Sequence, residues 1–359
     1  MITKLIPLLF LFAWTLPAVA ATKVCGNIPL ATDWTPKNSP YIVTNDIYVP
    51  LDSRLTILPG VVVKFARPGE CKDSTRQMDW ADSNYSGLKI EGLFYAKGTK
   101  EQPVIFESED YKPGQTGWDG IRIWNKNHMY VKIEHTIFRG ANKGLQLNNC
   151  QFAIKNSVFE HNNTGINMSR GNGMEVYNCN FISNKSCGIQ IISSAPDIQN
   201  SIFAYNHSYG IWSDSRPRVR IQYNDFWENT DANCYKCPRE ILQMVVENDA
   251  KDSTDVWSNV IADPVFISSD SYKNFRAKDL TLDTDTTKVQ DKKLAKIEKK
   301  HRKSRLSEEV EEPVKKDGPY MLSKYSTLIN AGNPSDQFKD ADGTRNDIGI
   351  YGSTTGNTE

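Results

Sequence analysis

The sequence has no excess of charge of either sign. Its 359 residues include 43 Lys and Arg and 43 Asp and Glu, so the formal net charge at pH 7 is zero. Net charge therefore does not indicate a nucleic acid partner. After residue 20 the sequence also lacks any apolar stretch of about 18 residues, the length that a membrane-spanning helix needs. We expect no nucleic acid partner and no transmembrane segment in the mature chain.

The first twenty residues have the pattern of a secretory signal peptide. Lys4 gives a short positive start, residues 5–16 are mostly apolar, and Ala18-Val19-Ala20 is a small-residue cleavage site. We expect residues 1–20 to be removed and the mature chain to be exported, to the periplasm or to the cell exterior.

The seven cysteines are an odd number, and all of them follow the expected signal peptide. Export permits disulfides, but an odd count leaves at least one thiol unpaired or intermolecular. Cys234 and Cys237 form a CxxC that has no second pair to complete a zinc site and no βαβ pattern for redox work. We expect a loop disulfide there, and a second one between Cys25 and Cys71 near the N-terminal end.

A repeat of about 22 residues runs through the middle of the chain. Aliphatic residues that begin successive repeats are separated by 21, 22, 22 and 23 residues; they are Ile133, Ile154, Val176, Ile198 and Ile221. A Phe stands five positions after the start of every repeat. In the last four repeats an Asn stands eight positions after the start. In the first four repeats a Gly-aliphatic pair comes after these positions. These are Phe138, Phe159, Phe181, Phe203 and Phe226, then Asn162, Asn184, Asn206 and Asn229, then Gly144, Gly165, Gly188 and Gly210. A fixed period of this length indicates a repeat architecture.

Runs of four to six residues with period two, such as residues 154–159, indicate short strands. We expect two or three strands in each coil and a spacing of about 4.8 Å between coils, so that like residues stack. Phe would then form an interior stack, while Asn would adopt left-handed turn geometry and pass side-chain hydrogen bonds between coils. Gly would relieve the turn before the next strand. The predicted fold is all-β, a single elongated right-handed parallel β-helix.

Segments outside the repeat resemble those of a known group of proteins. Residues 41–65 and 87–108 are similar to the opening segments of the secreted right-handed β-helix proteins of the pectate-lyase-like superfold, and residues 325–352 to their C-terminal signature. The resemblance covers residues 35–280 and 320–352. It implies the fold but not an activity, because this superfold carries lyases, hydrolases, epimerases, adhesins and plain binding proteins.

Residues 281–319 depart from this pattern. They have almost no aromatic residues and contain blocks of like charge, so they cannot bury a strand. We predict an exposed helical or disordered insertion, with a protein partner or a basic contact to an anionic glycan or membrane as further candidates. The predicted organisation is a signal peptide (1–20), a parallel β-helix (21–280), the charged insertion (281–319), and a last β-helix coil with a tail (320–359).

The strands that follow each glycine predict one face of the solenoid. The first and third residues after Gly should point inward, and the second and fourth outward. Predicted glycan-binding residues on or beside this face are Trp124, Gln146, Asn167, Gln190, Tyr209, Trp212 and Asp214. Amides pair with hydroxyls, and aromatic rings cover the apolar faces of sugars. We predict binding of a polysaccharide or cell-envelope glycan without catalysis; the alternative is an ordinary solvated sheet.

A polysaccharide lyase, glycoside hydrolase or epimerase is the second hypothesis. Glycoside hydrolysis needs two carboxylates about 5–10 Å apart. Neighbouring coils could place Glu91 and Asp119 at this spacing, beside Lys89 and Arg122. Glu91, Asp119 and Arg122 are therefore the candidate catalytic residues, and a surface ion-pair cluster is the simpler explanation.

The motifs of related enzymes weaken the catalytic hypothesis. Polygalacturonase-like enzymes have Asp before the Gly-aliphatic pair, where this chain has Lys143, Thr164, Cys187 and Tyr209. An Asp-Pro-His signature and a tight Asp cluster for calcium are both missing. We predict no metal and no cofactor. A structural or adhesion rod that binds a protein partner is the third hypothesis.

Overall fold

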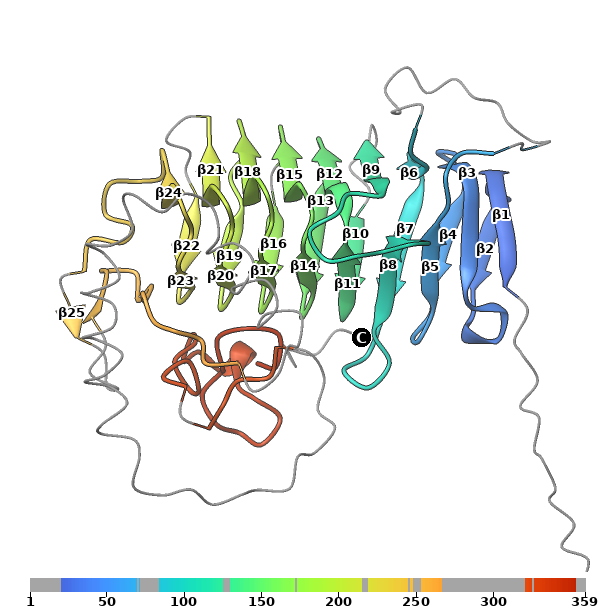
Figure 1. Ribbon diagram of the computed structural model, residues 1–359. Coiled ribbons are helices and arrows are strands. Elements are labelled where there is room, and N and C mark those ends of the chain that lie inside the picture. The colour runs from blue at the N-terminus through green and yellow to red at the C-terminus, as the bar shows by residue number, and fades with distance from the viewer. Residues whose placement is uncertain are drawn as a thin grey trace, which may run out of the picture.

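The computed structural model describes residues 21–69, 71, 84–124, 130–171, 173–214, 219–244, 246–247, 253–266, 320–324 and 326–352. In these residues the chain is an all-β parallel solenoid of about 8 turns, with ~23 residues per turn (Figure 1). The predicted signal peptide and charged insertion lie outside the described residues. Within the described ranges, no helix is long and apolar enough to cross a membrane.

Each complete coil gives one strand to each of three parallel sheets (Figure 1). The first sheet contains the Gly-aliphatic strands β6 (Gly87–Ile90), β9 (Trp118–Trp124), β12 (Ala141–Asn148), β15 (Thr164–Ser169), β18 (Cys187–Ile192) and β21 (Tyr209–Ser213). It ends with β24 (Ala232–Tyr235), which has no glycine. The second contains β2 (Ala31–Trp34), β4 (Arg54–Ile57), β7 (Leu93–Lys97), β10 (Tyr130–Glu134), β13 (Gln151–Lys155), β16 (Met174–Tyr177), β19 (Asp197–Gln199) and β22 (Arg220–Gln222).

The third sheet contains β5 (Val62–Phe65), β8 (Val104–Ser108), β11 (Thr136–Arg139), β14 (Val158–Glu160), β17 (Asn180–Ile182), β20 (Ile202–Ala204) and β23 (Asp225–Trp227). The long strand β3 (Tyr41–Val49) connects the first and third sheets, because its first half pairs with β5 and its second half with β6. β1 (Thr22–Asn27) pairs with β3 at the N-terminal end. A small hairpin of β25 (Val246–Glu247) and β26 (Ser253–Thr254) lies apart from the three sheets.

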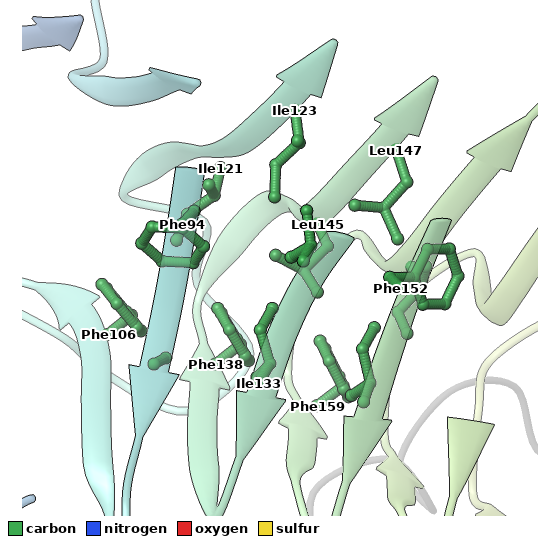
Figure 2. Packing of buried hydrophobic residues seen from close by; sticks show 14 of the residues in the cluster. Phe94, Phe106, Ile121, Ile123, Ile133, Phe138, Leu145, Leu147, Phe152 and Phe159 are labelled. Carbon is green, nitrogen blue, oxygen red and sulfur yellow. The ribbon is translucent and has the colours of Figure 1, made fainter. Parts of the chain in front are cut away.

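The phenylalanines of the repeat form the predicted interior stack. They are paired in register on the third sheet, and each side chain is 0% exposed. From Phe106 to Phe226, neighbouring ring centroids lie 4.8–5.1 Å apart and the ring planes differ by 3–10°. Figure 2 shows Phe106, Phe138 and Phe159 along this axis, with Leu145 and Leu147 of the first sheet in the same core.

The asparagines that follow each Phe form the predicted hydrogen-bond ladder. Asn184 Nδ2 donates to Asn206 Oδ1 at 2.9 Å and to the Phe159 carbonyl oxygen at 3.0 Å. Asn184 Oδ1 accepts from the backbone N–H of Asn162 at 3.1 Å. These amides are fully buried, and they satisfy one another from coil to coil.

The left-handed residue of this turn is the one before the Asn, which corrects the sequence-based expectation. His161, Ser183 and Tyr205 have φ of 54°, 52° and 58°. Because the preceding residue makes the turn, the Asn side chain is left to point into the solenoid. Asn does adopt left-handed geometry in the turn between the second and third sheets, at Asn156, Asn178 and Asn200, where φ is 49–53°.

The repeated glycines lie inside the strands of the first sheet, so their role is not to relieve a turn. A Cβ atom on Gly165 would lie 2.5 Å from the Gly188 carbonyl oxygen and 3.1 Å from Cδ1 of Phe181. The phenylalanine stack and the next coil thus occupy the space that a side chain would need. Glycine is required here by close approach.

Residues 320–352 pack on the outward side of the third sheet (Figure 1). Leu328 and Ile348 belong to a second apolar cluster with Val158 and Ile202. Three turn asparagines bind this segment: Asn156 donates to the carbonyls of residues 350 and 352, Asn178 to those of 347 and 349, and Asn200 accepts from the N–H of residue 333. In the described residues the segment adds no strand to the three sheets.

Both predicted disulfides are confirmed, between Cys25 and Cys71 and between Cys234 and Cys237. The three remaining cysteines, Cys150, Cys179 and Cys187, are free and buried in the repeats. Burial raises the pKa of Cys150 and Cys179 to about 12 and that of Cys187 to about 11.

Asn184→Ala is expected to destabilise the protein strongly. The substitution removes two donated hydrogen bonds and leaves the Asn162 N–H without its acceptor inside the solenoid. Leaving buried polar groups unsatisfied costs about 1–3 kcal/mol for each group. Urea unfolding measures the change. The control is Asn148→Ala, on the outward side of β12, and an equal loss in the two variants would contradict the ladder.

Gly165→Ala is expected to reduce the free energy of unfolding by about 1–3 kcal/mol, because the added methyl overpacks the core. Gly69→Ala is the matched control, since its Cβ would meet the Thr44 carbonyl oxygen at an ordinary 3.7 Å. Thermal unfolding of both variants tests this. If Gly165→Ala left the free energy of unfolding unchanged, the strand would have moved away from the phenylalanine stack, and the close approach would not require glycine.

The three buried thiols are expected to resist a thiol reagent in the folded protein at pH 8. At this pH each stays protonated, because its raised pKa lies well above 8, and the thiolate is the reactive form. Titration with a chromogenic disulfide reagent should count three thiols only after unfolding. Rapid reaction of any of them in the native protein would be inconsistent with their burial.

Candidate functional site

The outward side of the first sheet carries one side chain per coil in a continuous row. Register pairs each member with the next, and the row is Tyr48, Lys89, Arg122, Gln146, Asn167, Gln190, Trp212 and Tyr235. We call these eight residues the outward row. The inward neighbours Leu145, Leu147, Ile166 and Met168 are fully buried, which confirms the predicted alternation. Parallel pairing spaces the row at about 4.8 Å per coil.

The centre of the outward row is a run of three amides. Gln146 pairs with Asn167, and Asn167 with Gln190. Asn167 Nδ2 donates to Gln190 Oε1 at 2.5 Å, and only 5% of Asn167 is exposed. Because Gln190 is the acceptor in this pair, its NH2 group is the donor that a ligand hydroxyl would meet.

The C-terminal end of the outward row is aromatic. The rings of Trp212 and Tyr235 are 6.2 Å apart with an 18° angle between their planes, and Tyr209 lies 5.2 Å from Tyr235. Tyr209 comes from the neighbouring row, where it pairs with Cys187. Tyr235 is 38% exposed, so the group presents ring surface to solvent.

Sequence reasoning did not find the two ends of the outward row, Tyr48 and Tyr235. Tyr235 lies in β24, where Asn233 occupies the position that Gly210 has in the preceding coil. No Gly-aliphatic pair therefore indicates this strand. Counting 23 residues forward from Trp212 would have found it. Tyr48 lies in β3, before the regular repeat begins.

The other predicted glycan-binding residues lie beside the outward row. Trp124 belongs to the adjacent outward row, in register with Asn148, and is 44% exposed. Asp214 follows β21, and its carboxylate accepts from the backbone N–H and the hydroxyl of Ser193, both at 3.2 Å. These two hydrogen bonds hold the Asp214 carboxylate against the turn at Ser193.

Glu91 is held in a small network at the N-terminal end of the face. Its carboxylate contacts Lys89 Nζ at 3.1 Å and accepts from the Tyr48 hydroxyl at 2.8 Å. Burial, with a contribution from Glu91, raises the pKa of Tyr48 to about 12. These contacts fit the ion-pair cluster that was the simpler explanation for this part of the face.

The register does not bring Glu91 and Asp119 together. Gly87 pairs with Gly120, so Asp119 lies level with Ser86, whereas Ile90 pairs with Ile123, so Glu91 lies level with Trp124. Five residues along a strand separate the two levels by roughly 16 Å, more than the 5–10 Å of a hydrolytic pair. The catalytic role of these two carboxylates remains a prediction.

Arg122 lies between these two levels in the outward row. Burial lowers its pKa, and the nearby Asp119 carboxylate opposes that shift. Burial and the charge of Arg122 also lower the pKa of Lys143, while Asp119 again raises it. Asp119 therefore stabilises two half-buried cations, and the catalytic role of Arg122 also remains a prediction.

Two pockets in the described part of the chain do not lie on the outward row. A cavity of about 510 Å³ lies near the start of β6 and β9, beside Tyr85 and Thr116, and no residue of the outward row lines it. Among the residues that the structure describes, no group of three or more His, Cys, Asp or Glu could hold a metal ion.

Three parallel sheets, a stacked Phe core and an Asn ladder define a class: the protein is a parallel β-helix repeat protein. The family model of the right-handed beta helix region matches residues 111–237. A solved structure of QnrB1, a plasmid-mediated fluoroquinolone resistance protein, is 10% identical, with 74% of this chain and 98% of that chain covered. The TM-score between the two structures is 0.18. The comparison with curated proteins finds no match.

Proposed function

We propose that this β-helix protein is exported and binds an extended polysaccharide or cell-envelope glycan along the outward row, without catalysis. The observation that carries the proposal is the single in-register row in which amides are followed by aromatic rings. From Gln146 to Tyr235 this part of the row spans four coil spacings, about 19 Å. A regular row of this length is suited to a polymer whose own groups repeat along its axis.

The amides and the rings suit different parts of a sugar. Gln146 and Gln190, which flank the buried Asn167, offer donors and acceptors that a hydroxyl can meet with either of its roles. Trp212 and Tyr235 offer flat apolar surface with a polar edge, which matches the apolar face of a sugar ring. The two kinds of contact lie on one line, so a single chain can use both.

The positions of the acidic groups favour binding over hydrolysis. Glu91 and Asp119 lie at different levels of the sheet, and Glu91 already contacts Lys89 and Tyr48. A ligand on the amide and aromatic part of the outward row would not lie between two carboxylates. The outward row therefore recognises the glycan and does not cleave its bonds.

Trp212→Ala is expected to weaken glycan binding about tenfold or more, because the larger of the two aromatic surfaces in the outward row is lost. Native affinity electrophoresis in gels that contain hydroxyethylcellulose, laminarin, polygalacturonate or alginate measures the retardation. Reducing-sugar and unsaturated-product assays on the same mixtures record any turnover. The wild-type protein should be retarded by at least one polysaccharide and should release no product.

Tyr95→Ala is the matched control, since Tyr95 is a half-buried aromatic residue of β7 in the second sheet. It should bind as the wild type does. Equal weakening by both substitutions would point to lost stability rather than lost contact. Turnover would support the enzyme hypothesis instead, and absence of both binding and turnover would favour a structural rod.

A further inference from the structure

A disulfide closes the short loop that carries Tyr235. Cys234 and Cys237 are joined, with only Tyr235 and Lys236 between them. Tyr235 is the last residue of β24, and among the described strands β24 pairs with β21 alone. An inner strand of the first sheet has a partner on both sides, so Tyr235 has less backbone support than the other members of the outward row.

The two cysteines anchor this loop in the core. Cys234 pairs with Ile211 at an inward position, and both cysteines pack against the main apolar cluster. Directly after Tyr235 the backbone turns, because Lys236 has a φ of 54°. In earlier coils a second inward residue, such as Ile191 of β18, holds the strand beyond the outward position. The disulfide replaces that second contact.

We propose that the Cys234–Cys237 disulfide positions Tyr235 for glycan binding, so that reduction by a dithiol weakens binding by releasing the ring from Tyr209 and Trp212. This inference rests on the proposed function. In the reduction, two electrons and two protons pass from the dithiol to the disulfide. The S–S bond breaks, two protein thiols form, and the dithiol closes into its own cyclic disulfide. The freed loop samples conformations in which the rings no longer stack, and ordering it again opposes binding.

The other cysteines allow this disulfide to be tested alone. A full-length mature chain with Cys25→Ser and Cys71→Ser keeps Cys234–Cys237 as its one disulfide, because the three remaining cysteines are buried free thiols. Alkylation of the folded protein before and after dithiothreitol treatment, followed by mass spectrometry, should show two newly modified cysteines. That result establishes that the intended bond was reduced.

Binding and ring position are then measured in both redox states. The binding probe is the polysaccharide, among the four in the affinity gels, that retards the oxidised protein most. Reduction should weaken this binding about three- to tenfold, the range expected when one aromatic contact is lost. Near-ultraviolet circular dichroism of the protein without ligand is read at the long-wavelength tryptophan bands, beyond the absorption of the disulfide. These bands should change on reduction, since they report the packing of Trp212 against Tyr235.

Two variants show whether the effect acts through Tyr235. Tyr235→Ala should bind weakly in both redox states and should lose the redox-dependent change in circular dichroism. The double variant Cys234→Ala, Cys237→Ala should behave as the reduced protein does and should not respond to dithiothreitol. Equal affinities and unchanged dichroism in the oxidised and reduced states would overturn the inference.

Failure of the proposed function gives a different result. If the oxidised protein binds none of the four polysaccharides, glycan binding itself is contradicted, and with it the use of Tyr235 for that purpose. A redox-dependent dichroism that Tyr235→Ala removes would still support the positioning of the ring by the disulfide. If the oxidised protein binds and reduction changes nothing, only the role of the disulfide is wrong.

Discussion

Hydrogen bonding between successive coils is the constraint on which the rest of this structure depends. Each strand pairs in parallel and in register with the equivalent strand one coil away, as Phe159 does with Phe181 and Asn167 with Gln190. Because parallel strands lie about 4.8 Å apart, a side chain always meets the equivalent side chain of the next coil. The position of a residue within its coil thus decides whether its side chain points into the solenoid or outward. The same contacts then recur in each coil along the axis.

Inside the solenoid, this repetition gives buried polar side chains their hydrogen-bond partners. It also stacks bulky side chains so closely that they limit which residues fit beside them. A buried amide without partners would cost free energy, but Asn184 finds its partners in Asn162 and Asn206, which occupy the same position one coil away. The stacked Phe rings use the same register. They come so close to the first sheet that Gly165 cannot carry a Cβ. Phe, Asn and Gly therefore recur together, because each depends on the same spacing.

Outside the solenoid, the same register builds rows whose character differs between the sheets. On the third sheet, Lys64, Glu107, Arg139 and Glu160 alternate in charge along one row, so that neighbouring coils attract. Residues 320–352 cover the adjacent apolar part of that sheet. The first sheet has amides and aromatic rings in its outward row and no such cover in the described residues. This difference is what makes the first sheet the candidate binding face.

The sequence by itself determined the repeat, the interior Phe and the alternation of inward and outward residues, because these depend on period and residue type alone. It placed Gln146, Asn167, Gln190 and Trp212 correctly on one face for the same reason. The separation of Glu91 from Asp119, the close approach that requires Gly165 and the covering of the third sheet were decided only by the tertiary structure. The physical reason is that strand register fixes how far apart two outward residues lie, and packing fixes which segment returns to bury a face. The spacing of residues along the chain encodes neither the register nor the packing.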